Sequence, residues 1–173
     1  KGNLNNHIGV PLTLLNIKHH HEMAVVEMGA NHPGEIEELC KLSLPDFGVI
    51  TNVGKAHIEG FGSFENIIAT KTALYRAVIA NNGTLFVNAD DAVLRNELHY
   101  DKVVYYGQHG KDQVYGEVIK MTPYLVVRIF DLIVETNLTG FYNLYNILCA
   151  DAIWNYFKFN VDDIADHISG YVP

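Results

Sequence analysis

The 173-residue sequence is poor in charged residues, and few of these are basic. Charged side chains make up 18% of the chain, and 12 Lys and Arg against 20 Asp and Glu give a formal net charge of −8. A disordered chain would carry more charge and fewer apolar residues than the 49% present here. A nucleic-acid-binding protein would need a basic surface, and we therefore expect no nucleic-acid partner.

Three other features are scarce or missing. The only two cysteines, Cys40 and Cys149, each lie in an apolar helical context, which favours a reducing cytoplasm over a disulfide scaffold. No apolar run reaches the roughly 18 residues of a membrane span, and residues 1–9 are too polar for a signal peptide. Neither G-x-x-x-x-G-K-[ST] nor G-x-G-x-x-G occurs. We expect a cytoplasmic globular protein of about one domain, without a P-loop in this chain.

Short apolar runs alternate with helical patterns in the first half of the chain. The runs are residues 24–28, 47–53 and 83–88, and a long helical pattern covers residues 63–80. Runs of this length between helices are typical of buried parallel strands joined by helical crossovers. The sequence therefore predicts an α/β fold with a mostly parallel sheet flanked by helices.

The pattern changes after the third run. Short breaks separate four β-rich runs, which favours hairpins and a small antiparallel sheet. These runs are residues 102–106, 113–120, 124–130 and 132–138. An apolar helix is predicted over residues 140–157, and a short one over residues 161–169.

Polar residues at the ends of predicted strands are candidates for a metal site. Glu27 lies near the end of the first run, and Asn52 and His57 lie at or beyond the end of the second. Ligands bind at the carboxyl ends of strands in open parallel sheets, and carboxylate and imidazole groups suit divalent metals. The alternative is that Glu27 pairs with a lysine or caps a helix, and that His57 is an ordinary loop residue.

Lys71 lies in the middle of the apolar face of the predicted helix over residues 63–80. Ser63 is a suitable N-cap, and Glu65 in the first turn suits the helix dipole. A lysine on such a face normally extends its ammonium to the surface. The functional alternative is an amine whose pKa is lowered by burial, which can react or be modified.

Asn143 and Asn146 share one face near the start of the helix after Gly140. Their amides could cap the helix, or could donate to and accept from the N6 and N7 edge of adenine. The spacing does not decide between these two interpretations.

Six ordered blocks of the sequence resemble the Mur ligase family of ATP-dependent amide-forming enzymes. EMGANHPGEI favours the branch that adds D-alanyl-D-alanine to UDP-N-acetylmuramoyl-tripeptide in peptidoglycan precursor synthesis. The blocks are GNLNNHIGVPLTLL (2–15), AVVEMGANHPGEIEEL (24–39), VITNVGKAHIEGFGS (49–63), IATKTALYRAV (68–78), GTLFVNADD (83–91) and GFYNLYNILCA (140–150).

The resemblance implies ATP and two Mg²⁺ ions as cofactors, and it implies roles for particular residues. Glu27 is similar to a Mg²⁺ ligand, and His57 to the histidine that binds a second Mg²⁺. Lys71 is similar to the lysine that reacts with CO₂ to give an N6-carboxylated side chain that helps to hold the second metal. These three residues form the implied catalytic and metal site.

The resemblance also implies contacts to the nucleotide and the substrate. Asn143 and Asn146 correspond to adenine contacts. The implied region for the muramyl-peptide substrate contains Asn3, Asn5, Asn6, His7 and Asn31. The chain departs from the family where Tyr142 replaces a histidine, and where Thr72 and Ala73 replace a glycine and an acidic residue.

The implied reaction starts with phosphorylation of the substrate's terminal carboxylate by ATP. The amine of D-alanyl-D-alanine then attacks the acyl phosphate, and phosphate leaves. We expect residues 1–173 to be one truncated central domain that lacks the P-loop, the N-terminal UDP-substrate domain and the C-terminal domain, and that does not catalyse ligation alone. Rival hypotheses are a metal-dependent amidohydrolase and a non-catalytic fragment that binds nucleotide or substrate.

Overall fold

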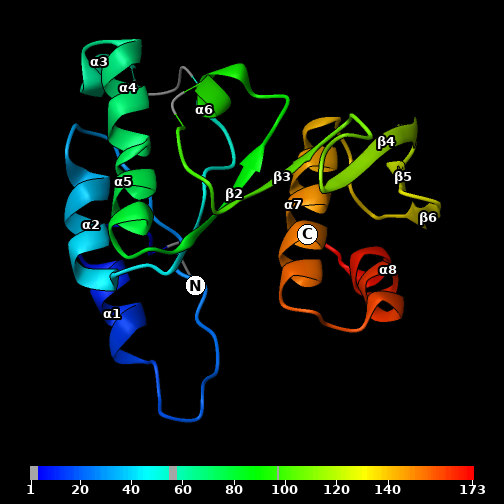
Figure 1. Cartoon of the computed structure of the whole chain (residues 1–173), viewed down its shortest axis with the longest axis horizontal. Coiled ribbons are helices and arrows are strands. Elements are labelled where there is room, and N and C mark those ends of the chain that lie inside the picture. Colours follow the sequence, from blue (N-terminus) through cyan, green and yellow to red (C-terminus); the bar gives the residue numbers. More distant parts are fainter. Residues whose placement is uncertain (1–3, 55–57, 97) are drawn as a thin grey trace. The chain divides into compact units, whose positions relative to one another are not determined.

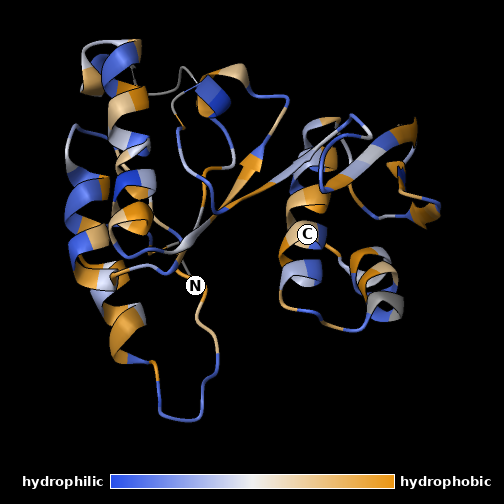
Figure 2. Cartoon of the chain, viewed as in Figure 1, coloured by the Kyte–Doolittle hydropathy of each residue, from blue (hydrophilic) through white to orange (hydrophobic). Residues whose placement is uncertain are grey.

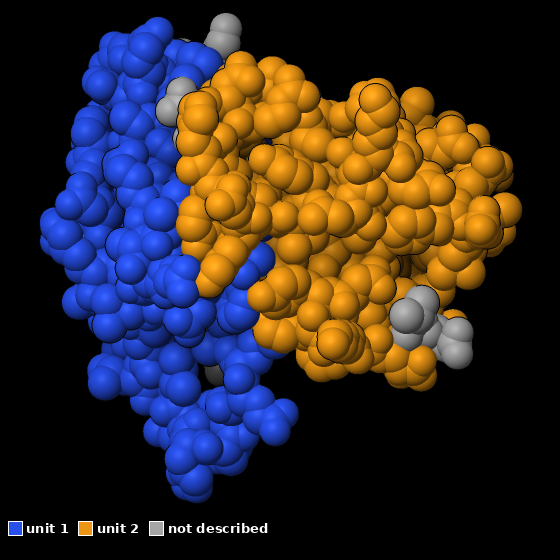
Figure 3. All heavy atoms as spheres, in the orientation of Figure 1, with its two compact units in different colours: residues 1–85 blue, residues 86–173 orange. Residues whose placement is uncertain are grey.

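The structure, a computed structural model, describes residues 4–54, 58–96 and 98–173. The chain folds into two compact units, Lys1–Leu85 and Phe86–Pro173 (Figure 3). The first unit holds the region of the implied metal site, and the second holds the implied adenine contacts. That residues 1–173 form a single central domain stays a prediction.

Helices make up most of the regular secondary structure of the first unit (Figure 1). Two of them, α4 and α5, follow the predicted helix over residues 63–80, which is interrupted at Thr72. Two short helices, α1 and α3, were not predicted from the sequence. The elements are α1 (Gly9–Leu15), α2 (Glu35–Ser43), β1 (Phe47–Val49), α3 (Ile58–Phe61), α4 (Phe64–Lys71), α5 (Ala73–Ala80) and the start of β2 (Thr84–Asn88).

The core of the first unit lies between α2 and α5. Ile36 and Cys40, one turn apart on α2, pack against Ala73 at the start of α5, and all three are buried. Helix α5 also packs on β1, and the backbone N–H of Thr84 donates to the carbonyl of Asp46 at 2.9 Å, which places β2 beside β1. The strand β2 is hydrophobic along most of its length (Figure 2).

The prediction of a strand over residues 24–28 is wrong. This segment is not in a strand, and Val25 is 89% exposed. A strand needs a hydrogen-bonded neighbour, and none of the strands in the described part of the chain pairs with this segment. Glu27 therefore lies on an irregular segment beside Met28, which packs against the core of the first unit.

The second unit combines a sheet with two longer helices (Figure 1). Its helices confirm the two predicted at the end of the chain. The elements are the end of β2, α6 (Ala92–Asn96), β3 (Val103–Gly107), β4 (Val114–Lys120), β5 (Val126–Ile129), β6 (Leu132–Glu135), α7 (Tyr142–Tyr156) and α8 (Val161–Gly170).

The predicted hairpins are confirmed for three of the four β-rich runs. β4 and β5 are antiparallel with Glu117 opposite Arg128, and β5 and β6 are antiparallel with Val127 opposite Val134. β3 instead pairs parallel to β4, with Tyr106 opposite Val114. The hairpin expected between β3 and β4 is therefore wrong.

Helix α7 packs on β3 and β4, and α8 packs on α7 and β6. Leu144 and Leu148, one turn apart, are fully buried and direct the apolar side of α7 to the sheet. Gly140 precedes the helix with φ of 85°, a left-handed conformation that favours glycine. A Cβ at this position would also lie 2.6 Å from the ring of Tyr142.

The strand order is β1-β2-β3-β4-β5-β6, in a mixed six-stranded sheet with flanking helices. The predicted α/β class is thus confirmed. No helix in the described ranges combines the length and the apolar character needed to cross a membrane.

Candidate functional site

Two of the implied site residues, Asn5 and Glu27, are in direct contact in the first unit. The Asn5 side-chain amide donates to Glu27 Oε1 at 3.0 Å, and the Gly29 backbone N–H donates to the Asn5 carbonyl at 2.7 Å. A Cβ at Gly29 would lie 2.8 Å from Asn5 Nδ2, so glycine permits this close approach. The chain before α1 is therefore held against the irregular segment that carries Glu27, and Asn5 orients the carboxylate.

The neighbouring implied substrate residues have different positions. Asn6 Oδ1 accepts from the backbone N–H groups of Ile8 and Gly9, both at 3.0 Å, so this side chain holds the first turn of α1. His7 is exposed. Asn3 lies outside the described residues. A structural role thus accounts for the Asn6 side chain.

Asn31 lies before α2, where Glu35 holds its backbone. The Glu35 carboxylate accepts from the N–H groups of Asn31 at 2.6 Å and His32 at 3.0 Å. The bond from the Asn31 N–H is the main reason why the pKa of Glu35 is lowered. This contact fixes the loop between Glu27 and α2.

Lys71 ends α4 and reaches the predicted strand-end residue Asn52. Its Nζ donates to the Asn52 carbonyl at 2.9 Å, and the half-buried position lowers the pKa of the ammonium by desolvation. Ser63 caps α4 as predicted, because its Oγ accepts from the Asn66 N–H at 3.2 Å. The hydrogen bond thus holds the Lys71 ammonium against the backbone at Asn52 and keeps it from extending into solvent.

Lys71 can act as a ligand of a divalent cation only if it is modified. A Glu27 carboxylate suits Mg²⁺, whereas an ammonium repels it and a carbamate oxygen would bind it. Among the described residues, no group of three or more His, Cys, Asp or Glu could hold a metal. His57, the remaining member of the implied trio, lies outside the described residues, so the trio stays a prediction.

Asn143 and Asn146 are joined on the first turn of α7 in the second unit. Asn146 Nδ2 donates to Asn143 Oδ1 at 2.9 Å, and Asn143 Nδ2 donates to the Thr139 carbonyl at 2.8 Å. The N-cap residue, Phe141, provides no side-chain cap. Asn143 therefore ties down the start of the helix, as in the structural interpretation, and at the same time fixes the amide of Asn146.

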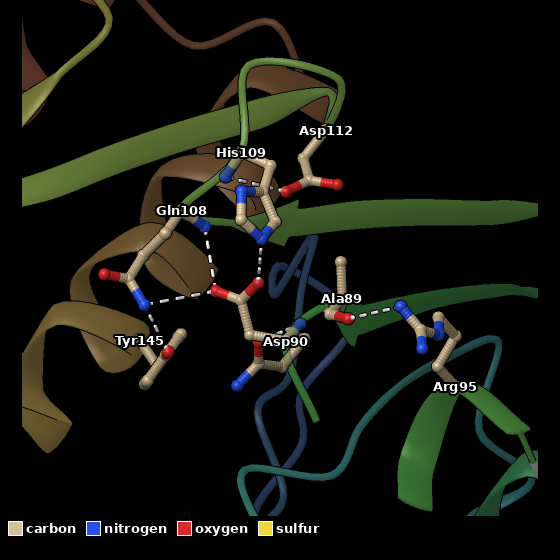
Figure 4. Close-up of polar contacts among 8 residues, drawn as sticks. Ala89, Asp90, Arg95, Gln108, His109, Asp112 and Tyr145 are labelled. Carbon is tan, nitrogen blue, oxygen red and sulfur yellow. Dashed lines mark hydrogen bonds and ion pairs between the residues drawn. The ribbon is translucent and has the colours of Figure 1, made fainter. Parts of the chain in front are cut away.

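A polar cluster that the sequence analysis missed lies at the ends of β2 and β3 (Figure 4). Asp90 Oδ2 accepts from the Gln108 backbone N–H at 2.9 Å and from Gln108 Nε2 at 3.4 Å. Gln108 Nε2 also donates to the Tyr145 hydroxyl at 2.7 Å, and His109 Nε2 lies 3.5 Å from Asp90 Oδ1. The cluster thus connects two strand ends to the first turn of α7.

The environment of Tyr145 reflects this cluster. Its pKa is raised, first by burial and then by the negative charge of Asp90. The hydroxyl therefore keeps its proton over the physiological range. The strand-end rule could have found Asp90, which follows the predicted strand over residues 83–88 by two positions.

Comparison with known families and curated proteins gives a consistent result. Residues 1–154 match the model of the Mur ligase middle domain. The UDP-N-acetylmuramoyl-tripeptide–D-alanyl-D-alanine ligase of Bacillus subtilis is 32% identical over 171 residues, which are 98% of this chain and 37% of that protein. The Haemophilus influenzae ligase of the same name is 41% identical over 114 residues, covering 64% of this chain and 24% of that protein.

Solved structures agree with this match. MurF from Acinetobacter baumannii superposes with a TM-score of 0.88 at 28% identity, over 100% of this chain and 39% of that one. MurF ligase from Thermotoga maritima in complex with ADP gives 0.82 at 29% identity, over 100% of this chain and 41% of that one. The chain thus spans less than half the length of these relatives. It belongs to the Mur ligase family, whose middle domain its residues 1–154 match.

Proposed function

We propose that this chain is the central, ATP-binding part of a ligase that joins D-alanyl-D-alanine to UDP-N-acetylmuramoyl-tripeptide. The observation that carries the proposal is that ligases of this name match nearly the whole chain, and one solved relative of the same fold holds ADP. The N-terminal UDP-substrate domain, the P-loop and the C-terminal domain would belong to the same polypeptide. Its place of action would be the cytoplasm.

Glu27 and His57 would hold two Mg²⁺ ions together with a carbamylated Lys71. The ions supply positive charge between two anionic reactants, the substrate carboxylate and the ATP γ-phosphate. Asn5 supports this role for Glu27, because its amide fixes one carboxylate oxygen at 3.0 Å. An acidic chain that handles anionic substrates needs such cations.

Carbamylation of Lys71 would convert a cation into an anionic ligand. The neutral amine attacks CO₂, a C–N bond forms, and one proton leaves to solvent, which gives the N6-carboxylate. Burial favours this step because it lowers the pKa of Lys71 and increases the neutral fraction. The Asn52 carbonyl, 2.9 Å from Nζ, holds the amine in place.

Asn143 and Asn146 would contact adenine at the first turn of α7. An amide that both donates and accepts matches the N6 and N7 edge of this base. The bond of 2.9 Å between the two side chains leaves them in a defined orientation. Tyr142, which stands where the family usually has histidine, is 67% exposed beside this turn.

Phosphate release by the full-length protein tests the proposal. We expect release that needs ATP, Mg²⁺, UDP-N-acetylmuramoyl-tripeptide and D-alanyl-D-alanine together. Omission of either peptide substrate should reduce the rate to the ATPase background. A rate that is independent of D-alanyl-D-alanine would contradict the proposal.

A further inference from the structure

Helix α7 starts without a side-chain cap, although the proposed adenine contacts lie on its first turn. The N-cap residue Phe141 has helical dihedral angles and offers no side-chain acceptor. Local bonds hold the turn instead: the N–H groups of Asn143 and Leu144 donate to the carbonyls of Gly140 and Phe141 at 3.2 and 3.0 Å, and the Asn143 side chain donates to the Thr139 carbonyl. These bonds are all made within the chain around the helix start, so a contact from elsewhere in the unit is needed to fix the turn relative to the sheet.

Gln108 supplies such a contact from the loop after β3. Its Nε2 donates to the Tyr145 hydroxyl at 2.7 Å, although the two residues are 37 positions apart in the sequence. A primary amide carries two N–H donors, and the same nitrogen lies 3.4 Å from Asp90 Oδ2. Gln108 thus bridges Asp90 and Tyr145 (Figure 4).

The Asp90 carboxylate, at one end of this bridge, is itself held in place. Its side chain is only 15% exposed, and Oδ2 also accepts from the Gln108 backbone N–H at 2.9 Å. The Asp90 backbone N–H donates to Asn88 Oδ1 at 3.0 Å, and Asn88 is buried at the end of β2. The carboxylate is therefore held by its own turn and by the loop that carries Gln108.

Tyr145 shares its turn with Asn143 and Asn146. A bidentate contact between an amide and a base loses much of its strength when the donor moves by about 1 Å, so anchoring this turn matters for binding. Burial and then the charge of Asp90 raise the pKa of Tyr145, so its hydroxyl stays protonated and can accept from Gln108. The bridge from Asp90 through Gln108 to Tyr145 thus ends beside the side chains that would contact adenine.

We propose that Gln108 is a positioning residue of the nucleotide site, which holds Tyr145 against Asp90 and thereby sets the first turn of α7. This inference rests on the proposed function, because it assigns adenine to Asn143 and Asn146. Gln108 itself acts through Tyr145 and need not touch the nucleotide.

Two variants of the full-length protein test the inference. Gln108→Leu keeps the approximate size and removes the donor, and Tyr145→Phe removes only the hydroxyl. Each should raise the KM for ATP about tenfold and leave the KM for D-alanyl-D-alanine unchanged, because one neutral hydrogen bond is lost. Each should also lower the preference for ATP over GTP. The double variant should be no worse than Gln108→Leu alone, since that substitution already removes the bond from Gln108 to the Tyr145 hydroxyl.

Gln113→Leu is the matched control. The Gln113 side chain bonds only to backbone groups of β3, with Nε2 3.2 Å from the Val103 carbonyl and Oε1 accepting from the Tyr105 N–H. This variant should lower the melting temperature without changing the KM ratio. Trp154, the single tryptophan of the chain and a residue of α7, reports by fluorescence whether the helix is intact.

The outcomes separate the two proposals. If the wild type binds ATP and the folded variants keep its KM for ATP and its preference over GTP, the positioning role is wrong and the proposed function stands. If the wild type binds no ATP, both the positioning role and the proposed function are wrong. If Gln108→Leu does not fold, the milder Tyr145→Phe variant decides the question alone.

Discussion

The ammonium of Lys71 donates a hydrogen bond to the backbone carbonyl of Asn52, 2.9 Å away. This contact joins the end of α4 to the segment that follows β1, the second strand end named by the sequence analysis. It holds in one place an amine whose pKa burial has lowered.

Lys71→Ala in the full-length protein should nearly abolish ligation, with a loss of at least about 100-fold in kcat. The reason is that the variant cannot form the carbamate that would help to hold a metal. A buffer rich in CO₂ should not restore activity, since no amine is left to react. Lys41→Ala is the control, because Lys41 is an exposed lysine paired with Glu37 and Glu38. Near-normal turnover of Lys71→Ala would refute the carbamate assignment.

Asn5→Ala should raise the Mg²⁺ concentration needed for half-maximal activity about tenfold. The variant removes the donor that orients Glu27 Oε1, and residues that orient metal ligands typically affect metal affinity by about 10- to 100-fold. Asn16→Ala serves as the comparison, since its exposed side chain bonds only to the Leu12 carbonyl. Equal Mg²⁺ dependence in the two variants would argue against Glu27 as a ligand.

Asp151→Asn should stabilise the protein at pH 7 by about 2 kcal/mol. Burial in α7 raises the pKa of Asp151 from 3.8 to about 6, so the folded state binds the proton more tightly than the unfolded state. The stabilising contribution of this group is full below pH 3.8 and is lost as the pH rises through about 6. The asparagine keeps an acceptor for Asn155 Nδ2, which lies 2.9 Å from Asp151 Oδ2.

Denaturant unfolding between pH 4 and pH 8 measures this effect. The gap in unfolding free energy between Asp151→Asn and the wild type should open between pH 4 and pH 6 and stay constant above. Asp166→Asn on α8 is the exposed control and should show no such gap. A constant gap over the whole range would mean that folding does not shift the pKa of this carboxyl.

Ser63→Ala should cost about 1 kcal/mol of stability, because it removes the N-cap of α4. The control is Ser43→Ala. The Ser43 hydroxyl donates to the Leu39 carbonyl near the end of α2, so its removal leaves no backbone N–H without an acceptor. Thermal unfolding compares the two. Equal melting temperatures of the Ser63→Ala and Ser43→Ala variants would show that the Ser63 cap does not stabilise α4.

Sequence patterns predicted the longer helices well, though not the short helices α1, α3 and α6, because apolar spacing and caps are local. The pattern over residues 63–80 and the Ser63 cap both appear in α4 and α5. The strand over residues 24–28 was predicted wrongly because pairing depends on a neighbour, which an apolar run does not reveal. The parallel pairing of β3 with β4 was missed for the same reason, since a short break favours a hairpin only on average.

The site was predictable only in part. The strand-end rule identified Glu27 and Asn52, and the block resemblance identified Asn5; the structure brings Asn5 to Glu27, and Asn52 to Lys71. The link from Gln108 to Tyr145 could not be predicted, because it joins a loop and a helix that are far apart in the sequence. Such contacts arise from the packing of α7 on β3.

Analysis of the products formed by the full-length protein tests most directly whether it is a D-alanyl-D-alanine-adding ligase. Mass spectrometry of a reaction with ATP, Mg²⁺, UDP-N-acetylmuramoyl-tripeptide and isotopically labelled D-alanyl-D-alanine should show one labelled pentapeptide product for each ADP and phosphate formed. No product should form without ATP. Absence of the labelled product, or hydrolysis of an amide without ATP, would contradict the assignment as a ligase.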